Sequence, residues 1–275
     1  MVEQVQEKRS SKSFADLWVE KVLGKSSMLV AGFDPDDVLS KDEVRSLGKE
    51  YIDNVNQQAI AVKLNQKFYL NKLDVWSELA QYAQSKGLLV VADSKIIDIG
   101  NTAQKAIKFT RMSMFQAETF DSNTSGNEKY LVKEAGSLAS IFTILMSNDE
   151  AVEKNKKDKD EVLKYLDRVL EAGASGVVIG ATYANEGEVG QKVFRETLKS
   201  IKDFQEKTGK TILILVPGFG KQGGDVKKFL TAIKESGLDP KQCMINVGTS
   251  LMKPEMGTTT ESQAQKFAKE TAEFL

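Results

Sequence analysis

Short apolar runs alternate with amphipathic stretches along most of this chain, and this alternation restricts the possible folds more than any other feature. Seven runs have the length and character of buried strands: Met28–Phe33, Ile60–Leu64, Leu88–Ala92, Ala139–Met146, Gly176–Gly180, Thr211–Val216 and Cys243–Val247. Stretches with helical periodicity separate them, the clearest being Lys41–Gln58, Leu70–Ser85, Lys159–Glu171, Val189–Lys207, Val226–Glu235 and Glu261–Phe274. Such a succession of strand and helix predicts parallel βαβ units.

The number of these units favours a closed barrel. Eight units in 275 residues are typical of a TIM (β/α)8 barrel, and the eighth strand is best placed at Ala117–Ser122, although its polar residues are unusual for a buried strand. A doubly wound open sheet is the alternative, but no G-x-G-x-x-G sequence follows the first strand. We therefore predict an α/β fold in which residues 1–275 form one barrel domain, with an additional N-terminal helix around Phe14–Leu23 that closes the bottom of the barrel.

The composition excludes several kinds of site and partner. The chain has no histidine and a single cysteine, which excludes histidine-based triads, histidine metal ligands and structural zinc. Cys243 lies in an apolar run and is expected to be a buried thiol, which fits a reducing compartment such as the cytoplasm. The net charge of −1 gives no indication of nucleic-acid or membrane binding. No stretch is long and apolar enough to span a bilayer, and the polar segment Met1–Ser13 lacks the core of a signal peptide.

A cluster of charged residues follows the third apolar run. Asp93 and Lys95 come directly after Ala92, and because side chains alternate along a strand, both are expected to point to the same side. Asp98 follows once the chain has turned. A surface ion pair would explain the cluster equally well by itself, since charges at a strand end need partners. Its position at the C-terminal end of a parallel strand, where barrels build their active sites, favours catalysis.

Polar or glycine-rich sequence follows most of the other predicted strands as well. The residues concerned include Asp34, Lys63, Ser147, Gly248 and Thr249. The strand at Thr211–Val216 is followed by Pro217–Asp225, which contains four glycines. Barrels often bind phosphate with the loops after the last two strands and a helix N-terminus, and glycines let the backbone approach an anion. A flexible loop is the alternative interpretation, but the position favours a phosphate site.

These residues resemble the sequence pattern of the orotidine 5′-phosphate decarboxylase family. The family signature D-x-K-x-x-D-I-x-x-T is present as Asp93, Lys95, Asp98, Ile99 and Thr102. The strand-one aspartate of the family corresponds to Asp34, and its strand-two lysine, in a K-x-N-x-x-F/Y-like setting, lies in Lys63–Tyr69. The segment P-G-x-G-x-Q-G-G-D is complete at Pro217–Asp225. The resemblance extends from Asp34 to Ser250, with its parts in order and at barrel spacing.

The resemblance implies a decarboxylase that needs no metal or other cofactor and acts as a homodimer on a small nucleotide. The implied catalytic charge network is Lys63, Asp93, Lys95 and Asp98, with the Asp98 and Thr102 equivalents supplied by the partner subunit. Asp93 would lie against the substrate carboxylate, and Lys95 would protonate C6 of the pyrimidine as carbon dioxide leaves. The implied substrate contacts are Asp34, Lys63, Asp98 and Thr102 to the ribose, Ser147 to the pyrimidine, Gln222 to phosphate and base, and Pro217, Gly248 and Thr249 in the loops around the phosphate.

One position departs from the family pattern, and two other functions stay open. The family has an arginine where this chain has Thr249; that arginine pairs with the phosphate, and Lys221 is the residue that could replace its charge. The first alternative is a metal-dependent sugar-phosphate lyase or decarboxylase of the same suprafamily, resembling hexulose-phosphate synthase, in which an acidic residue typically replaces Lys63. The second is a non-catalytic nucleotide-binding barrel, which the missing arginine favours and the intact charge network opposes.

Overall fold

The computed structural model describes residues 12–121, 126–146, 148–220 and 222–275. Within them, eight parallel strands form a closed barrel in sequence order. The predicted barrel is therefore confirmed, and the open-sheet alternative is wrong. The strands are β1 Leu29–Gly32, β2 Ala61–Leu64, β3 Leu89–Ile96, β4 Ala117–Phe120, β5 Ala139–Leu145, β6 Gly176–Ile179, β7 Leu213–Val216 and β8 Cys243–Val247.

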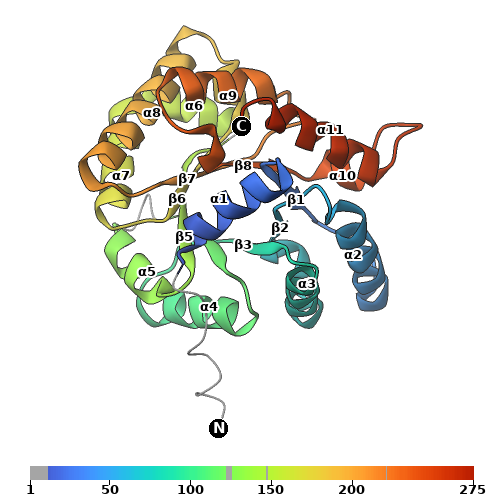
Figure 1. Ribbon diagram of the computed structural model, residues 1–275. Coiled ribbons are helices and arrows are strands. Elements are labelled where there is room, and N and C mark those ends of the chain that lie inside the picture. The colour runs from blue at the N-terminus through green and yellow to red at the C-terminus, as the bar shows by residue number, and fades with distance from the viewer. Residues whose placement is uncertain (1–11, 122–125, 147, 221) are drawn as a thin grey trace.

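Helices surround the strands on the outside, as Figure 1 shows. Most of the amphipathic stretches in the sequence correspond closely to helices, namely α2 Lys41–Val55, α3 Leu73–Ser85, α7 Lys159–Glu171, α8 Glu188–Thr208, α9 Val226–Glu235 and α11 Thr260–Ala272. The structure adds α4 Gly100–Met112, α5 Glu128–Ala135, α6 Asp149–Lys157, α10 Thr249–Met252 and the short 3-10 helices η2 Gln66–Tyr69, η3 Ala181–Ala184 and η4 Pro240–Gln242. None of the described helices is long and apolar enough to cross a membrane.

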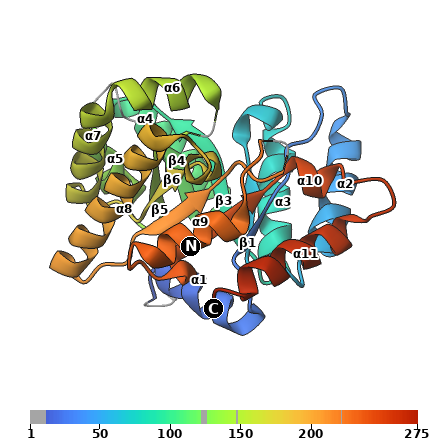
Figure 2. The ribbon, with the colours of Figure 1, turned by 90° about the horizontal axis from the view of Figure 1, so that it is seen from above.

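The N-terminal helix α1, Phe14–Lys25, closes the bottom of the barrel as predicted. The indole N–H of Trp18 donates to the carbonyl of Lys241 at 2.8 Å, just before β8. The ammonium group of Lys25 donates to the carbonyl of Ala59 at 2.9 Å, just before β2. Figure 2 shows α1 below the strands and α6 above them. Because α1 bonds to residues that lie just before β8 and β2, it is at the N-terminal ends of the strands. The C-terminal ends of the strands meet on the opposite side of the barrel.

The strand with the weakest sequence signal, β4, lies where it was predicted. All of its residues, including Glu118 and Thr119, are buried. Glu118 pairs with Ser140 of β5 along the sheet and accepts a hydrogen bond from Thr110 of α4 at 2.7 Å. A carboxyl group is tolerated at this position because its oxygens have hydrogen-bond partners.

The third strand is longer than predicted. β3 continues to Ile96 rather than ending at Ala92, and its register against β4 shifts between those two residues. The backbone amide of Lys95 in the shifted segment bonds to a β4 side chain, the hydroxyl of Thr119. Such side-chain bonds keep the irregular segment attached to the sheet, which the apolar pattern alone does not indicate.

Strand register brings the sequence-predicted charges onto the inner face of the barrel. Gly32 of β1 is paired with Lys63 of β2, and Lys63 is paired with Val91 of β3. Paired residues of neighbouring parallel strands share a face, and residues two apart in one strand share it too. Asp93 therefore points to the same interior as Lys63.

Candidate active site

Three charged side chains from two neighbouring strands meet at the C-terminal end of the barrel. Lys63 Nζ lies 2.6 Å from Asp93 Oδ2, and Lys95 Nζ lies 2.6 Å from Asp93 Oδ1. The side chains of Lys63 and Asp93 are 7% and 9% exposed, whereas that of Lys95 is 26% exposed. One carboxylate thus lies between two ammonium groups, and the more accessible ammonium belongs to Lys95.

The electrostatics of this network keep its buried members charged. Burial raises the pKa of Asp93, but the ammonium groups of Lys63 and Lys95 lower it more, so that the pKa lies well below its usual value. Burial lowers the pKa of Lys63, but the carboxylates of Asp93 and Asp34 outweigh this effect and raise it. Removing either partner of the buried pair would leave an unbalanced buried charge.

Thr119 connects the charge network to β4. Its hydroxyl donates to Asp93 Oδ1 at 3.0 Å and accepts from the backbone N–H of Lys95 at 3.0 Å. Lys95 has a φ of +49°, in the left-handed region that residues other than glycine seldom adopt. The prediction that Asp93 and Lys95 point to the same side is therefore correct, but the backbone between them is an irregular strand rather than a regular one.

Glu118 lies behind this irregular segment, on the outer face of the sheet, and is fully buried. Its Oε1 accepts from the backbone N–H groups of Ser94 and Thr119 at 3.1 and 2.8 Å. Its Oε2 forms hydrogen bonds with the hydroxyls of Ser94 and Thr110 at 3.1 and 2.7 Å. Burial raises the pKa of Glu118 to about 8, so that this carboxyl group is mainly protonated at neutral pH.

The raised pKa of Glu118 has a measurable consequence for stability. Below about pH 4.5 the group is protonated in the folded and the unfolded chain; between about 4.5 and 8 only the folded chain keeps the proton, so raising the pH favours unfolding. Glu118→Gln does not titrate. Its free energy of unfolding, relative to wild type, is expected to rise by about 1.4 kcal/mol per pH unit across this window. Urea unfolding of both proteins at several pH values measures the difference, and parallel curves would contradict it.

Asp34 follows β1 beside the charge network. Its Oδ1 is buried and has no hydrogen-bond partner among the described residues. The hydroxyls of two buried tyrosines, Tyr51 and Tyr69, donate at 2.9 and 3.0 Å to the carbonyls of the two residues that precede Asp34. A Cβ atom on Gly248 would lie 4.0 Å from Asp34 Oδ2, so the end of β8 adjoins this carboxylate. A buried acceptor without a partner is suited to a donor on a ligand.

The sequence prediction did not include Asn246 or Thr119 among the site residues. Asn246 is 9% exposed, and its Oδ1 is buried without a partner among the described residues. This oxygen lies 3.4 Å from the position of a Cβ atom on Gly32, so Asn246 faces the same interior as Asp34. The available signal was a polar side chain inside a strand whose other residues are buried, at an inward position of the alternation.

The glycine-rich segment after β7 packs against α10, the short helix that follows β8. A Cβ atom on Gly220 would lie 2.0 Å from Ser250 Oγ, and Gly220 has a φ of +89°; only glycine fits this position. The loop also bonds to itself, because the N–H of Gly223 donates to the carbonyl of Gly220 at 2.9 Å and that of Gly224 to Gly218 at 3.0 Å. These two N–H groups are already used, so they are not available to an anion as the sequence had suggested.

The helix N-terminus next to this loop carries a negative charge. Asp225 is the N-cap of α9, and its carboxylate accepts from the backbone N–H of Lys228 at 2.9 Å. An acidic N-cap stabilises a helix because it occupies the free amides of the first turn. The expected attraction of this helix end for a phosphate is therefore offset by Asp225 itself.

The structure does not bring every predicted residue to the network. Asp98 and Thr102 are exposed, and no hydrogen bond or ion pair among the described residues joins their side chains to Asp93 or its two lysines. Of the residues predicted around the phosphate, Pro217 and Gly248 are half-buried, and Gln222 and Thr249 are exposed. Ser147 and Lys221 lie outside the described residues.

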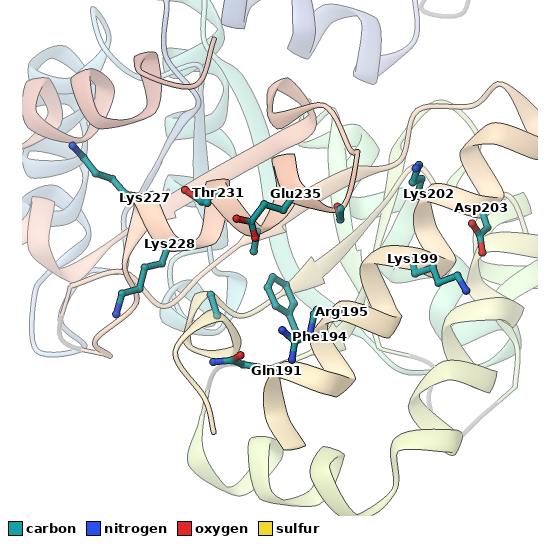
Figure 3. Close-up of a pocket in the computed structure, with 13 residues that line it drawn as sticks. Gln191, Phe194, Arg195, Lys199, Lys202, Asp203, Lys227, Lys228, Thr231 and Glu235 are labelled. Atoms are coloured by element: carbon teal, nitrogen blue, oxygen red, sulfur yellow. The ribbon is translucent and has the colours of Figure 1, made fainter. Parts of the chain in front are cut away.

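A separate surface cavity of about 650 Å³ lies between α8 and α9. Figure 3 shows that basic side chains of both helices surround it, among them Arg195, Lys199, Lys227 and Lys228. These helices form the outer layer of the barrel, whereas barrel enzymes place their chemistry at the C-terminal ends of the strands. The charge network at the barrel end is therefore the better candidate for an active site.

Comparison with known proteins agrees with this location. The sequence model described as the orotidine 5′-phosphate decarboxylase / HUMPS family matches residues 27–255, a range that includes the charge network and both glycine-containing loops. The chain is 26% identical over 234 residues to the orotidine 5′-phosphate decarboxylase of Natronomonas pharaonis, and the alignment covers 78% of this chain and 80% of that relative.

Solved structures share the barrel fold. The UMP synthase of Leishmania donovani has a TM-score of 0.75 at 22% identity; the match covers 95% of this chain and 56% of that chain, so this chain spans little more than half of it. The orotidine 5′-monophosphate decarboxylase of Methanocaldococcus jannaschii, complexed with the inhibitor BMP, has a TM-score of 0.64 at 20% identity, and the match covers 88% of this chain and 97% of that one.

Proposed function

The chain belongs to the orotidine 5′-phosphate decarboxylase / HUMPS family, and from this premise we propose that it is an enzyme that converts orotidine 5′-phosphate to uridine 5′-phosphate in pyrimidine nucleotide synthesis. One observation carries the proposal within the family. Asp93 lies between Lys63 and Lys95 at 2.6 Å from each ammonium group, at the end of the barrel where such enzymes act. Relatives named for this activity align with most of the chain.

The reaction follows from the charges of this network. The bond between C6 and the carboxylate carbon breaks, carbon dioxide leaves, and the electron pair stays on C6. The ammonium group of Lys95 stabilises this developing charge and then transfers a proton to C6; solvent returns the proton to Lys95. A fixed cation of this kind stabilises the transition state more than the ground state, which is the condition for catalysis.

Asp93 acts on the substrate carboxylate. Its two lysine partners keep it ionised despite its burial, and the resemblance implies that it lies against the carboxylate that leaves. Two like charges side by side raise the energy of the bound substrate, and the repulsion falls as the substrate carboxylate becomes neutral carbon dioxide. Asp34, with a buried oxygen that lacks a partner among the described residues, is suited to accept a hydrogen bond from a ribose hydroxyl.

The metal-dependent alternative is not favoured by the donor set. Enzymes of that kind typically carry an acidic residue where this chain has Lys63. Here the ammonium group of Lys63 is buried and bonded to Asp93 at 2.6 Å. A metal ion at this carboxylate would lie next to two ammonium charges and be repelled. We therefore propose a reaction that needs no metal or other cofactor.

A second subunit is proposed to complete the active site. Asp98 and Thr102 are exposed in the single chain, and the side chains that flank Asp98, Ile97 and Ile99, are 61% and 63% exposed. Two exposed isoleucines on either side of Asp98 are suited to burial against a second subunit. In the proposed homodimer each subunit is the single barrel domain predicted for residues 1–275, and Asp98 and Thr102 of one subunit reach the substrate of the other.

The single thiol supports the proposed location of the enzyme. Cys243 is buried and free, and burial raises the pKa of its thiol, so it is an unreactive core residue. A chain with one cysteine forms no internal disulfide. We propose that the enzyme works in the cytoplasm.

An absorbance assay with orotidine 5′-phosphate tests the proposed function. The pyrimidine spectrum changes as the carboxylate is lost, and turnover is expected to be the same with and without EDTA. Turnover that EDTA abolishes would support the metal-dependent alternative. Nucleotide binding without turnover would support the non-catalytic barrel.

Replacing Thr249 by arginine is expected to strengthen substrate binding. Thr249 is exposed on the first turn of α10 and cannot balance a phosphate charge, whereas arginine forms charge-assisted, bidentate bonds with phosphate. We expect KM for orotidine 5′-phosphate to fall by roughly tenfold or more in Thr249→Arg, which corresponds to about 1.4 kcal/mol per factor of ten.

Thr249→Gln, polar but uncharged, is the control for this change, and its KM should stay close to that of wild type. An unchanged KM in Thr249→Arg together with lost binding in Lys221→Ala would show that Lys221 already supplies the charge. If neither substitution alters KM, the ligand carries no phosphate at this place.

A further inference from the structure

Glu118 makes four hydrogen bonds, and two of them hold the segment that carries the charge network. Ser94 lies between Asp93 and Lys95, and both its N–H and its hydroxyl donate to the Glu118 carboxyl, each at 3.1 Å. The pairing of β3 with β4 is irregular here, because the register shifts between Ala92 and Ile96. Glu118 therefore accepts a hydrogen bond from the Ser94 N–H, which in a regular ladder would donate to a backbone carbonyl of the neighbouring strand.

The same carboxyl group also fixes Thr119. The Thr119 N–H donates to Glu118 Oε1 at 2.8 Å, and the Thr119 hydroxyl bonds to both Asp93 Oδ1 and the Lys95 N–H at 3.0 Å. One buried oxygen thus joins the backbone on either side of the network, at Ser94 of β3 and at Thr119 of β4. Lys95 has a φ of +49°, a strained conformation for a lysine. Such a conformation persists only where the surrounding hydrogen bonds hold the backbone in place.

We propose that Glu118 is a positioning residue for the decarboxylation, which holds the irregular Ser94–Lys95 segment so that the Lys95 ammonium group stays beside Asp93 and faces C6 of the substrate. The inference rests on the proposed function. Glu118 lies on the opposite face of the sheet from the substrate and acts only through Ser94 and Thr119. Its replacement therefore changes the orientation of Lys95 rather than any contact to the phosphate or ribose.

The conservative variant is glutamine. The Glu118 carboxyl is mainly protonated at neutral pH because burial raises its pKa to about 8, so an amide resembles it in charge and shape. The amide oxygen can accept from the two backbone N–H groups, and the amide NH2 can donate to the hydroxyls of Ser94 and Thr110, which accept as well as donate. Alanine removes all of these bonds and leaves two buried N–H groups without an acceptor.

Steady-state kinetics of Glu118→Ala and Glu118→Gln test the proposal. We expect kcat of Glu118→Ala to fall by roughly thirtyfold or more while KM for orotidine 5′-phosphate stays within about threefold, because a misplaced proton donor slows chemistry and spares binding. Glu118→Gln is expected to restore kcat to within about threefold of wild type. Val169→Ala is the control for lost stability: Val169 is a fully buried residue of α7, and this variant should have a lower Tm and an unchanged kcat.

A wild-type kcat in folded Glu118→Ala would overturn the inference and leave the proposed function intact. Should Glu118→Ala yield no folded protein, Glu118→Asp, which keeps the carboxyl group but retracts it by one methylene, is expected to lower kcat at least fivefold, and an unchanged kcat there would overturn the inference equally. A kcat of Glu118→Gln as low as that of Glu118→Ala would also contradict it. A wild-type protein that does not decarboxylate the nucleotide would refute the proposed function, and the inference with it.

Discussion

Lys95→Ala is expected to lose nearly all decarboxylase activity, with kcat/KM lower by roughly 10⁴-fold or more. In the proposed mechanism the side chain supplies two effects at once: a proton for C6, and a fixed positive charge beside the developing electron pair. General acid catalysis typically contributes about 10²–10⁴ and a fixed electrostatic contact about 10²–10³. The fold should survive, because Asp93 keeps its bonds to Lys63 and Thr119 and the Lys95 side chain is partly exposed at the barrel end.

The matched control is Lys86→Ala. Lys86 directly follows α3 and pairs with Asp53 at 2.6 Å, before β3 begins and therefore at the opposite end of the barrel from Lys95. Its loss should change neither kcat nor KM. Circular dichroism and Tm of both variants report folding. Turnover near the wild-type rate in folded Lys95→Ala would refute the assignment of Lys95 as proton donor.

Mixing Lys95→Ala subunits with Asp98→Ala subunits is expected to restore activity that neither variant has alone. In a hybrid of the proposed dimer, the intact Lys95 of one subunit would meet the intact Asp98 of the other, so one of its two active sites would be complete. Random exchange at equal amounts makes about half of the dimers hybrid, and the mixture should then reach roughly a quarter of wild-type activity. Turnover after subunit exchange, with native mass spectrometry to count hybrids, provides the measurement.

The control for this experiment is Lys95→Ala mixed with the double variant Lys95→Ala, Asp98→Ala, whose hybrids contain no intact lysine and should stay inactive. Hybrid dimers that form but show no more activity than this control would disprove a shared site. A chain that remains monomeric at assay concentrations while it turns over substrate would do so as well.

The barrel itself could be predicted because its evidence is local and repeated. Each buried parallel strand is a short apolar run, and each covering helix has one apolar face, so periodicity indicates both. Even β4 could be predicted, because a barrel needs an eighth strand, although its own residues gave little indication of one. Its polar residues have partners far apart in the sequence, since Glu118 binds Ser94 and Thr119 binds Asp93, and a single strand read alone does not show such pairing.

The sequence by itself determined which residue types are available for chemistry. It has a lysine, an aspartate and a second lysine at strand ends, and because it has no histidine and only one cysteine it offers no histidine-based or zinc site instead. Only the tertiary structure decided which of these groups meet. Asp93 is placed between Lys63 and Lys95 by strand register and by an irregular segment with a left-handed lysine, while Asp98 and Thr102 are exposed and do not join them. Likewise, the N-terminus of α9 looked free for a phosphate until Asp225 was seen to cap it. The physical reason is that residue types and their period are properties of a short segment, whereas register, burial and hydrogen-bond partners depend on segments that only the closed barrel brings together.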